Sequence, residues 1–482
     1  MKDKKMNLSA QTDPMEKGND SQQIFNRQKE AFFKRPFLPY EERMDVLMKI
    51  EQILQANDDK ICTAICADFG NRSHHETKIL EITSSLMGVR YTRKRLKKWM
   101  RSQKRHTSLV FFGGSNRVIP QAKGVVGIVT PWNYPLFIAL GPLICAIAAG
   151  NRVMVKQAAN SQTLCNLLQK LFSEKISEEL IAFLPGVPAN EFSCLPFDHL
   201  VFTGSPKVGK TIMATAAKNL TPVTLELGGK SPTILAQDFD LKTAVERILF
   251  AKFMNAGQTC VAPDYLFVPK GRENDFIQMA KTIVSHRYPK IETRDYTSII
   301  DEKAYLRLLA TLEDARKKNA TIINLLPGPQ SDDALQKISP TIVTAVTEEM
   351  ILMQDEIFGP LLPIMPYESL DEVIAYINRH ERPLALYAFS NDKAFLNKLI
   401  DNTRSGGVTI NDCAMHVAQH DLPFGGIGNS GMGQYHGYEG FAEFSKLRPV
   451  FKQAKKALAI TPPYGATFNS IYALVKKIKW IA

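Results

Sequence analysis

The sequence lacks the paired cysteines that a disulfide-rich or metal-binding domain would need. Its seven cysteines are an odd number, and no Cys-x-x-Cys pair occurs among them. Cys62 and Cys66 lie one helical turn apart, but no histidine or cysteine at ligand spacing accompanies them, so packing explains them better than a metal. A scattered set of thiols is typical of a reducing compartment. The sequence therefore predicts a cytoplasmic protein without disulfides and without a metal site.

Long hydrophobic runs are also missing. The longest apolar stretch, residues 136–149, is too short to span a bilayer and contains glycine and proline. The first 20 residues are polar and charged and lack the apolar centre of a signal peptide. We therefore expect a soluble protein.

Acidic residues are outnumbered, with 48 Asp and Glu against 60 Lys and Arg, and the net charge is +12. Such a charge attracts anions in general, including nucleic acid, phospholipid and cofactor phosphates. The densest basic run, residues 93–101, could be a patch for nucleic acid or phospholipid. A helix with a solvated basic face and Leu96, Trp99 and Met100 turned inward explains it better. No signature of a nucleic-acid-binding fold is present, so we predict no nucleic acid partner.

The spacing of apolar residues indicates an α/β protein. With 482 residues, of which 45% are hydrophobic and 22% charged, the chain is long enough for two or three domains. Residues 124–129 and 152–155 are typical of buried strands, and residues 136–149 between them of a buried helix. Strand, helix and strand in this order predict a parallel, doubly wound sheet, whose ligands bind at the carboxyl ends of the strands.

Three further segments carry structural predictions. Apolar residues recur at helical spacing between Tyr40 and Ile61, which predicts a packing helix. Residues 109–112 and 117–120 resemble a hairpin around a Gly-Gly-Ser-Asn turn that could cross to another subunit. A second α/β region runs from about Ser231 to Asn411.

Two short runs carry the chemistry. Residues 226–230 (Glu-Leu-Gly-Gly-Lys) place a carboxylate before two glycines, and residues 255–260 (Asn-Ala-Gly-Gln-Thr-Cys) place a thiol after a glycine turn. A thiolate can attack a carbonyl group, and a nearby carboxylate can activate the water that later releases the acyl group from sulfur. A lone cysteine is more often a small buried apolar residue. Together the two runs favour covalent catalysis.

Four motifs resemble those of aldehyde dehydrogenases in order and spacing. They are Pro-Trp-Asn-Tyr-Pro at 131–135, Glu-Leu-Gly-Gly-Lys at 226–230, Gly-Gln-Thr-Cys at 257–260 and Glu-Ile-Phe-Gly-Pro at 356–360. The runs at 260–265 and 428–437 resemble the branch with class-three, fatty aldehyde and coniferyl aldehyde dehydrogenases. The runs at 67–73 and 462–465 resemble most closely the bacterial coniferyl aldehyde enzymes of that branch.

The resemblance implies an α/β aldehyde dehydrogenase fold with two doubly wound Rossmann-like domains, a small bridging β-arm and a homodimer. The parts that it predicts are a cofactor-binding domain (1–102 and 123–228), a catalytic domain (229–432), the bridging and oligomerisation arm (103–122 and 445–458) and an amphipathic tail (459–482).

The same resemblance implies the catalytic roles. Cys260 is expected to add as a thiolate to the aldehyde carbon, and the amide of Asn133 with the backbone N–H of Cys260 to hold the oxyanion. Glu226 is then expected to activate water that hydrolyses the thioester. The alternatives without a catalytic role are that Asn133 is a turn residue and that Glu226 caps a helix.

The cofactor implied by the resemblance is NAD or NADP. Glu356 corresponds to the carboxylate that holds the nicotinamide ribose, with Phe358 packed near the ring, and Lys156 to the lysine at the adenosine ribose. After Lys156 the run is Gln-Ala-Ala, and Ala159 stands where many NAD-preferring relatives have a glutamate, which predicts relaxed cofactor choice. The remaining expected cofactor contacts are Thr130, Trp132, Gly204, Ser205, Gly209 and Leu227. The Gly-Ser turn at 204–205 leads into a helix N-terminus that can bind phosphate.

An aromatic substrate tunnel is expected from Tyr134, Phe424, Tyr435 and His436, each of which could instead belong to the core. Such walls favour aromatic aldehydes such as coniferyl aldehyde, or medium to long aliphatic ones. The alternatives are a CoA-acylating or semialdehyde-type enzyme of the same superfamily, and a non-catalytic scaffold. Glu226 argues against the first and the complete motif set against the second.

The C-terminal tail predicts an amphipathic helix. From Phe468 onward, apolar residues gather on one side, and three lysines lie elsewhere. Docking on the enzyme's own surface, over the tunnel mouth, is the favoured interpretation, with peripheral membrane contact as the alternative. The apolar positions are Phe468, Ile471, Val475, Ile478 and Ile481.

Overall fold

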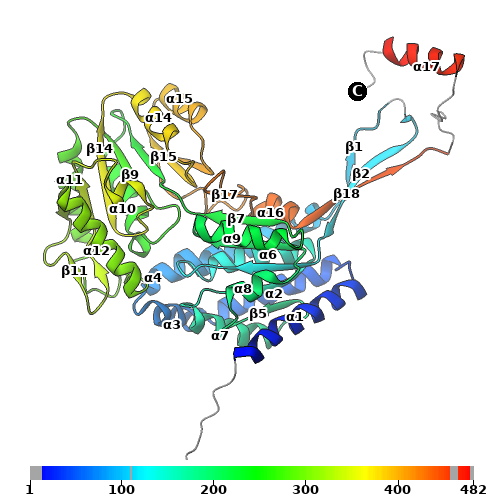
Figure 1. Cartoon of the computed structure of the whole chain (residues 1–482), viewed down its shortest axis with the longest axis horizontal. Coiled ribbons are helices and arrows are strands. Elements are labelled where there is room, and N and C mark those ends of the chain that lie inside the picture. Colours follow the sequence, from blue (N-terminus) through cyan, green and yellow to red (C-terminus); the bar gives the residue numbers. More distant parts are fainter. Residues whose placement is uncertain (1–13, 109–110, 456–464, 478–482) are drawn as a thin grey trace, which may run out of the picture.

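The strands of the chain form two large sheets, a three-stranded arm and a two-stranded ribbon. The computed structural model describes residues 14–108, 111–455 and 465–477. Both large sheets are mostly parallel and have helices packed around them (Figure 1). The predicted α/β architecture with two sheets and a projecting arm is confirmed.

The first sheet has six strands, and two of its neighbouring inner strands, β3 (Val125–Val129) and β4 (Arg152–Lys156), are buried along their whole length. This burial on both faces explains why their sequences are almost continuously apolar. The parallel strands are β3, β4, β5 (Ile181–Phe183), β6 (His199–Gly204) and β7 (Val223–Leu227). The edge strand β17 (Gly431–Met432) pairs with β7 in the antiparallel direction, so residues from the predicted catalytic range complete the first sheet.

The helices near the first sheet follow the predicted apolar pattern with one correction. The helix expected between Tyr40 and Ile61 is two helices, because Asn57 leaves the helical conformation and its side chain donates to the carbonyl oxygen of Ile53. The basic run lies on α5, whose Leu96 and Trp99 are buried, as expected for a solvated basic face. The helices of this region are α1 (Pro14–Lys34), α2 (Tyr40–Ala56), α3 (Asp58–Phe69), α4 (His74–Glu76), a π-helical turn (Thr77–Thr83), α5 (Ser84–Trp99), α6 (Phe137–Ala149), α7 (Gln162–Ser173), α8 (Ala189–Cys194), α9 (Pro206–Ala217) and α16 (Gly437–Glu443).

The second sheet has seven strands in the order β10-β13-β14-β9-β8-β15-β16, and only the edge strand β10 is antiparallel. The strands are β8 (Pro232–Leu235), β9 (Tyr265–Pro269), β10 (Thr321–Asn324), β13 (Thr341–Thr344), β14 (Leu361–Tyr367), β15 (Ala385–Phe389) and β16 (Gly407–Ile410). The helices are α10 (Leu241–Phe253), α11 (Glu273–Arg287), α12 (Glu302–Lys317), α13 (Ile351–Gln354), α14 (Leu370–Arg379) and α15 (Lys393–Asn402), and β11 (Ser331–Asp332) pairs with β12 (Lys337–Ile338) in a separate ribbon.

The arm is an antiparallel sheet of β1 (Gln103–Arg105), β2 (Ser115–Ala122) and β18 (Ser445–Lys452), and it projects from the body (Figure 1). The prediction that residues 109–112 form the first strand of a hairpin is wrong. Residues 109–110 lie outside the described part, and Phe111 to Gly114 form a turn in which the N–H of Gly114 donates to the oxygen of Phe111. The left-handed φ of +83° at Gly113 places the turn earlier than the sequence suggested.

The C-terminal helix α17 (Ala466–Lys477) lies beyond the tip of the arm (Figure 1). The expected position over the tunnel mouth is therefore not what the single chain adopts. Residues 456–464 and 478–482 of the predicted tail lie outside the described part. None of the helices in the described ranges combines the length and apolar character that crossing a bilayer requires.

Candidate active site

A cavity of about 580 Å³ lies where the carboxyl ends of β6 and β7 meet loops of the second sheet. Carboxyl ends of parallel strands are the usual ligand-binding edge of such sheets. Most of the residues expected at the site line this cavity. They are Trp132, Asn133, Tyr134, Gly204, Ser205, Glu226, Leu227, Cys260, Glu356, Phe358, Phe424 and Tyr435.

Cys260 follows a strained turn that begins where α10 ends. Asn255 and Ala256 have φ values of +52° and +50°, which side-chain-bearing residues rarely adopt. Gly257 follows with φ +75°, and a Cβ there would lie 2.3 Å from the carbonyl oxygen of Gly359. Only glycine fits this close approach of two backbones. Strain of this kind persists where the surroundings enforce it, and here it sets the position of the thiol.

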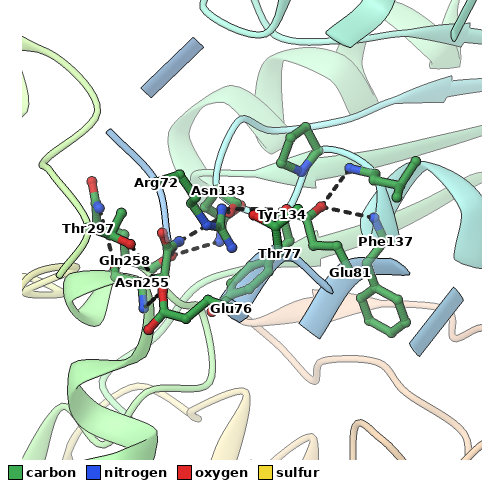
Figure 2. Close-up of polar contacts among 12 residues, drawn as sticks. Arg72, Glu76, Thr77, Glu81, Asn133, Tyr134, Phe137, Asn255, Gln258 and Thr297 are labelled. Carbon is green, nitrogen blue, oxygen red and sulfur yellow. Dashed lines mark hydrogen bonds and ion pairs between the residues drawn. The ribbon is translucent and has the colours of Figure 1, made fainter. Parts of the chain in front are cut away.

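A buried hydrogen-bond network ties this turn to Asn133 (Figure 2). The amide nitrogen of Asn133 donates to the backbone oxygen of Gln258 at 3.1 Å. The backbone oxygen of Asn133 accepts from Asn255 Nδ2 at 3.1 Å and from Arg72 Nη1 at 2.6 Å. Because a side-chain amide has two N–H donors, one donor of Asn133 is left for a ligand.

Two glutamate side chains, the half-buried Glu76 and the fully buried Glu81, support the network from behind (Figure 2). Glu76 accepts from the backbone N–H of Asn255 and from the hydroxyl of Thr297, both at 3.0 Å. Glu81 accepts from the backbone N–H groups of Leu136 and Phe137 at the start of α6. Burial raises the pKa of both carboxyls. The carboxylates therefore fix the two chain segments that carry Cys260 and Asn133.

Arg72 joins the two halves of this network, and sequence reasoning missed it. Its side chain has no exposed surface, and its guanidinium lies 3.5 Å from Glu81 and 4.9 Å from the ring centre of Tyr134. Arg72 belongs to the 67–73 run that resembled coniferyl aldehyde enzymes. Nothing in that run indicates that an arginine would be buried, since arginine is rarely buried without a partner.

The surroundings of Cys260 favour the protonated thiol over the thiolate. Burial, followed by repulsion from the carboxyls of Glu356 and Glu226, raises its pKa to about 12, while the backbone N–H groups of Cys260 and Val261 oppose the rise. The proton must leave the sulfur as part of the reaction.

Glu226 lies near the end of β7 with 2% of its surface exposed. Within the described residues, neither carboxyl oxygen has a hydrogen-bond partner. Burial alone raises its pKa well above 4.5. A buried, unpartnered carboxyl that faces a cavity is a typical general acid or base, because its pKa moves toward neutral pH.

The other end of the cavity fits a dinucleotide. Ser205 caps α9 by accepting from the N–H of Val208, so the helix N-terminus opens beside Gly204. A Cβ at Gly228 would lie 2.0 Å from Glu356 Oε2, so only glycine leaves this carboxyl in place. The pKa of Glu356 is raised to about 8, mainly by burial and secondly by repulsion from Asp264. The ring of Phe358 meets that of Trp132 edge to face at 5.4 Å.

Three expected cofactor contacts lie behind the cavity wall. Lys156 ends β4 beside Thr130, whose N–H donates to the oxygen of Lys156. Both side chains are buried, and burial lowers the pKa of Lys156. Gly209 packs on Leu227, and a Cβ there would lie 2.7 Å from that side chain. These residues do not line the cavity in the present conformation.

The substrate end of the cavity is apolar. Tyr134 is held by a 2.7 Å hydrogen bond between its hydroxyl and that of Thr259. Phe424 and Tyr435 pair across an isolated β-bridge. The expectation that His436 lines the same cavity is wrong, because its ring lies behind these aromatics and lines a second, smaller cavity. The sequence also missed several apolar wall residues, which are Ile79, Leu80, Met87, Phe137, Ile138, Phe250 and Met254.

Comparisons with known proteins agree with this geometry. Residues 11–450 match the model of the aldehyde dehydrogenase family. A probable coniferyl aldehyde dehydrogenase of Pseudomonas aeruginosa is 45% identical over 465 residues, covering 95% of this chain and 96% of the relative. Aldehyde dehydrogenase family 3 member A2 of Pongo abelii is 37% identical over 434 residues, 89% of this chain and 88% of the relative. The structure of Staphylococcus aureus AldH in its substrate-bound state superposes with a TM-score of 0.89 at 36% identity, covering 94% of this chain and 99% of that one.

Proposed function

Because the chain belongs to the aldehyde dehydrogenase family, we propose that it oxidises aromatic aldehydes of the coniferyl type to carboxylic acids with NAD or NADP. One observation carries the proposal. Cys260, Asn133 and Glu226 line a single cavity whose remaining walls are largely apolar and aromatic. A thiol, an amide and a carboxyl in such a cavity suit acyl transfer through sulfur.

The reaction begins when Cys260 Sγ forms a bond to the aldehyde carbon and its thiol proton passes to solvent water. The carbonyl oxygen becomes an oxyanion, which the free N–H of Asn133 and the backbone N–H of Cys260 can hold. Arg72, Glu76 and Asn255 keep these donors in place through the buried network. Preorganised donors of this kind typically contribute about 100- to 1,000-fold in rate.

The second half of the reaction needs a hydride acceptor and a base. When bound, an oxidised nicotinamide dinucleotide supplies the hydride acceptor and a positively charged ring. Loss of hydride from the reacting carbon leaves a thioester on Cys260. Glu226, once deprotonated, takes a proton from water, the resulting hydroxide attacks the thioester carbon, and the C–S bond breaks to release the acid.

The apolar residues that line the large cavity support the proposed substrate class. Ile79, Met87 and Phe137 extend the aromatic lining into an apolar site that a two-carbon aldehyde would leave largely empty. A medium or long aliphatic aldehyde is the second candidate, because the same walls accept an alkyl chain. A CoA-acylating enzyme has no use for a buried general base, so Glu226 argues against that alternative.

Cofactor choice is proposed to be relaxed. Ala159 supplies no carboxylate to repel a 2′-phosphate, and Lys156 supplies a cation at the carboxyl end of β4. The lowered pKa of the buried lysine indicates that it lacks a compensating anion, which a phosphate would provide. We therefore propose that both NAD and NADP are accepted.

The first experiment measures reduced cofactor by absorbance with coniferyl aldehyde, hexanal and acetaldehyde, each with NAD and with NADP. We expect kcat/KM for coniferyl aldehyde to exceed that for acetaldehyde at least about tenfold, since burying a large apolar group contributes about 1.5–3 kcal/mol. Both cofactors should support turnover. Absence of turnover with coniferyl aldehyde would contradict the proposed substrate, and strict rejection of NADP would contradict the proposed cofactor choice.

For assembly and location we propose a cytoplasmic homodimer joined through the arm. Phe112 and Phe451 on the arm are 77% and 47% exposed, which a partner subunit would cover. The exposed rings of Phe468 and Tyr472 on α17 are proposed to dock on protein and not on lipid. Sedimentation velocity with and without neutral lipid vesicles should give a dimer that stays free of vesicles, and a monomer or a vesicle-bound species would contradict this proposal.

A further inference from the structure

A second cavity of about 20 Å³ lies next to the substrate end of the large one. Ser84 and Phe137 line both cavities, so the two cavities adjoin at these side chains. A space of this size holds about one oxygen atom with its hydrogen, because roughly 10–15 Å³ suffices for a water molecule. Its walls include Ser85, His420 and His436.

Several polar atoms around the small cavity have no hydrogen-bond partners. Among the described residues, Ser85 Oγ, His420 Nε2 and both ring nitrogens of His436 are buried without a hydrogen bond. Ser85 is 2% exposed and His436 is 4% exposed. A buried polar group without a partner costs about 1–3 kcal/mol, so unpaired polar atoms on three side chains around one space favour a polar group at this place.

His436 is also held in a strained backbone conformation. Its φ of +79° and ψ of 149° lie in a region that is essentially restricted to glycine. Such strain costs about 1–3 kcal/mol and concentrates at functional sites. The strained backbone aims an imidazole without partners at the small cavity, which packing alone does not explain.

The aromatic rings around His436 connect it to the substrate site. Its ring centre lies 4.9 Å from that of Tyr435, 5.7 Å from Phe424 and 5.9 Å from both Phe137 and His420. Tyr435, Phe424 and Phe137 all line the large cavity. His436 therefore lies directly behind the wall that an aromatic substrate would contact.

The charge state of the His436 and His420 rings determines which kind of ligand the small cavity suits. Burial lowers the pKa of His436 to about 3 and also lowers that of His420, so both rings are neutral at pH 7. A neutral imidazole has one donor and one acceptor, and a serine hydroxyl has both functions. This set suits a neutral hydroxyl, which also donates and accepts. It does not suit an anion or a metal, and the described residues contain no cluster able to hold a metal ion.

We propose that Ser85, His420 and His436 form a subsite that binds the ring hydroxyl of a hydroxylated aryl aldehyde. The subsite rests on the proposed function, since it recognises the end of the substrate opposite to the aldehyde that Cys260 attacks. A substrate without the hydroxyl leaves these polar atoms unpaired in the complex. Sites built in this way discriminate strongly against the analogue that lacks the hydroxyl.

The test compares 4-hydroxycinnamaldehyde with cinnamaldehyde, which differ only in this hydroxyl. We expect the wild-type enzyme to prefer the hydroxylated substrate about 10- to 100-fold in kcat/KM. In Ser85→Ala the preference should fall several-fold, and in His436→Phe it should fall to near unity. His286→Gln, on the exposed surface of α11, is the matched control and should keep the wild-type preference.

Binding of the unreactive 4-hydroxycinnamyl and cinnamyl alcohols, measured by calorimetry, separates the two proposals. A binding preference for the hydroxylated alcohol without turnover of either aldehyde would support the subsite and overturn the proposed function. Turnover of both aldehydes without a preference would overturn the subsite, because the cavity would then hold a water molecule only. Circular dichroism and thermal melting check folding, and Ser85→Ala with His420→Phe decides the question where His436→Phe fails to fold.

Discussion

Replacement of Cys260 by alanine is expected to lower kcat for the best aldehyde by at least about 10⁴-fold while leaving the fold and cofactor binding intact. The reason is that Cys260 is the one cysteine among the described residues that line the cavity, and its sulfur forms the covalent bond that divides the reaction into two steps. Removal of a catalytic nucleophile has effects of this size or larger in other covalent enzymes. Steady-state turnover should be measured together with cofactor affinity and thermal stability.

Cys194→Ala is the matched control for this experiment. Cys194 is the exposed cysteine among those that the structure describes, and it lies at the end of α8, outside the cavity lining. Its replacement should leave kcat and KM unchanged. Parental turnover in the Cys260→Ala enzyme would refute the covalent mechanism, whereas loss of turnover in both variants would indicate a general effect of removing thiols.

The sheets could be predicted from the sequence where burial alone decides the pattern. The runs that became β3 and β4 are almost continuously apolar because both faces of these strands are covered, so no knowledge of neighbours is needed. The break between α2 and α3 and the first strand of the arm were missed. Both depend on single residues, Asn57 and Gly113, whose backbone angles the apolar pattern does not encode.

The placement of Asn133, Glu226 and Cys260 in one cavity could be predicted because their motifs follow strands or close a turn beside them. The pKa values of these residues could not be predicted from the sequence. The direction of the pKa shift of Cys260 depends on burial and on Glu356, which folding alone brings near. Arg72 was missed and His436 was placed in the wrong cavity for the same reason. A polar side chain is usually exposed, and its burial is a property of the tertiary structure.

Replacement of Glu226 by glutamine is expected to lower steady-state kcat about 10²- to 10⁴-fold, the usual contribution of a general base. Acylation of Cys260 consumes no water and therefore does not require Glu226 as a base. A rapid burst of about one reduced cofactor per subunit should then precede the slow hydrolysis of the thioester. Stopped-flow absorbance measures the burst, and intact-protein mass spectrometry should detect the acyl group on Cys260. Glu302→Gln, an exposed position at the start of α12, should show neither effect.

The pH dependence of stability tests the same residue independently of catalysis. Burial raises the folded-state pKa of Glu226 well above 4.5, so the folded chain holds a proton that the unfolded chain releases. Above the unfolded pKa, this difference lowers the free energy of unfolding as pH rises, until the pH reaches the raised folded pKa. Glutamine does not ionise in either state. The melting temperature of Glu226→Gln relative to the wild type should therefore be higher at pH 8 than at pH 5, and wild-type deacylation should accelerate over the same range as Glu226 loses its proton. A difference in melting temperature that does not change with pH would show that Glu226 is already ionised in the folded protein, and the buried carboxyl would then owe its charge to a partner.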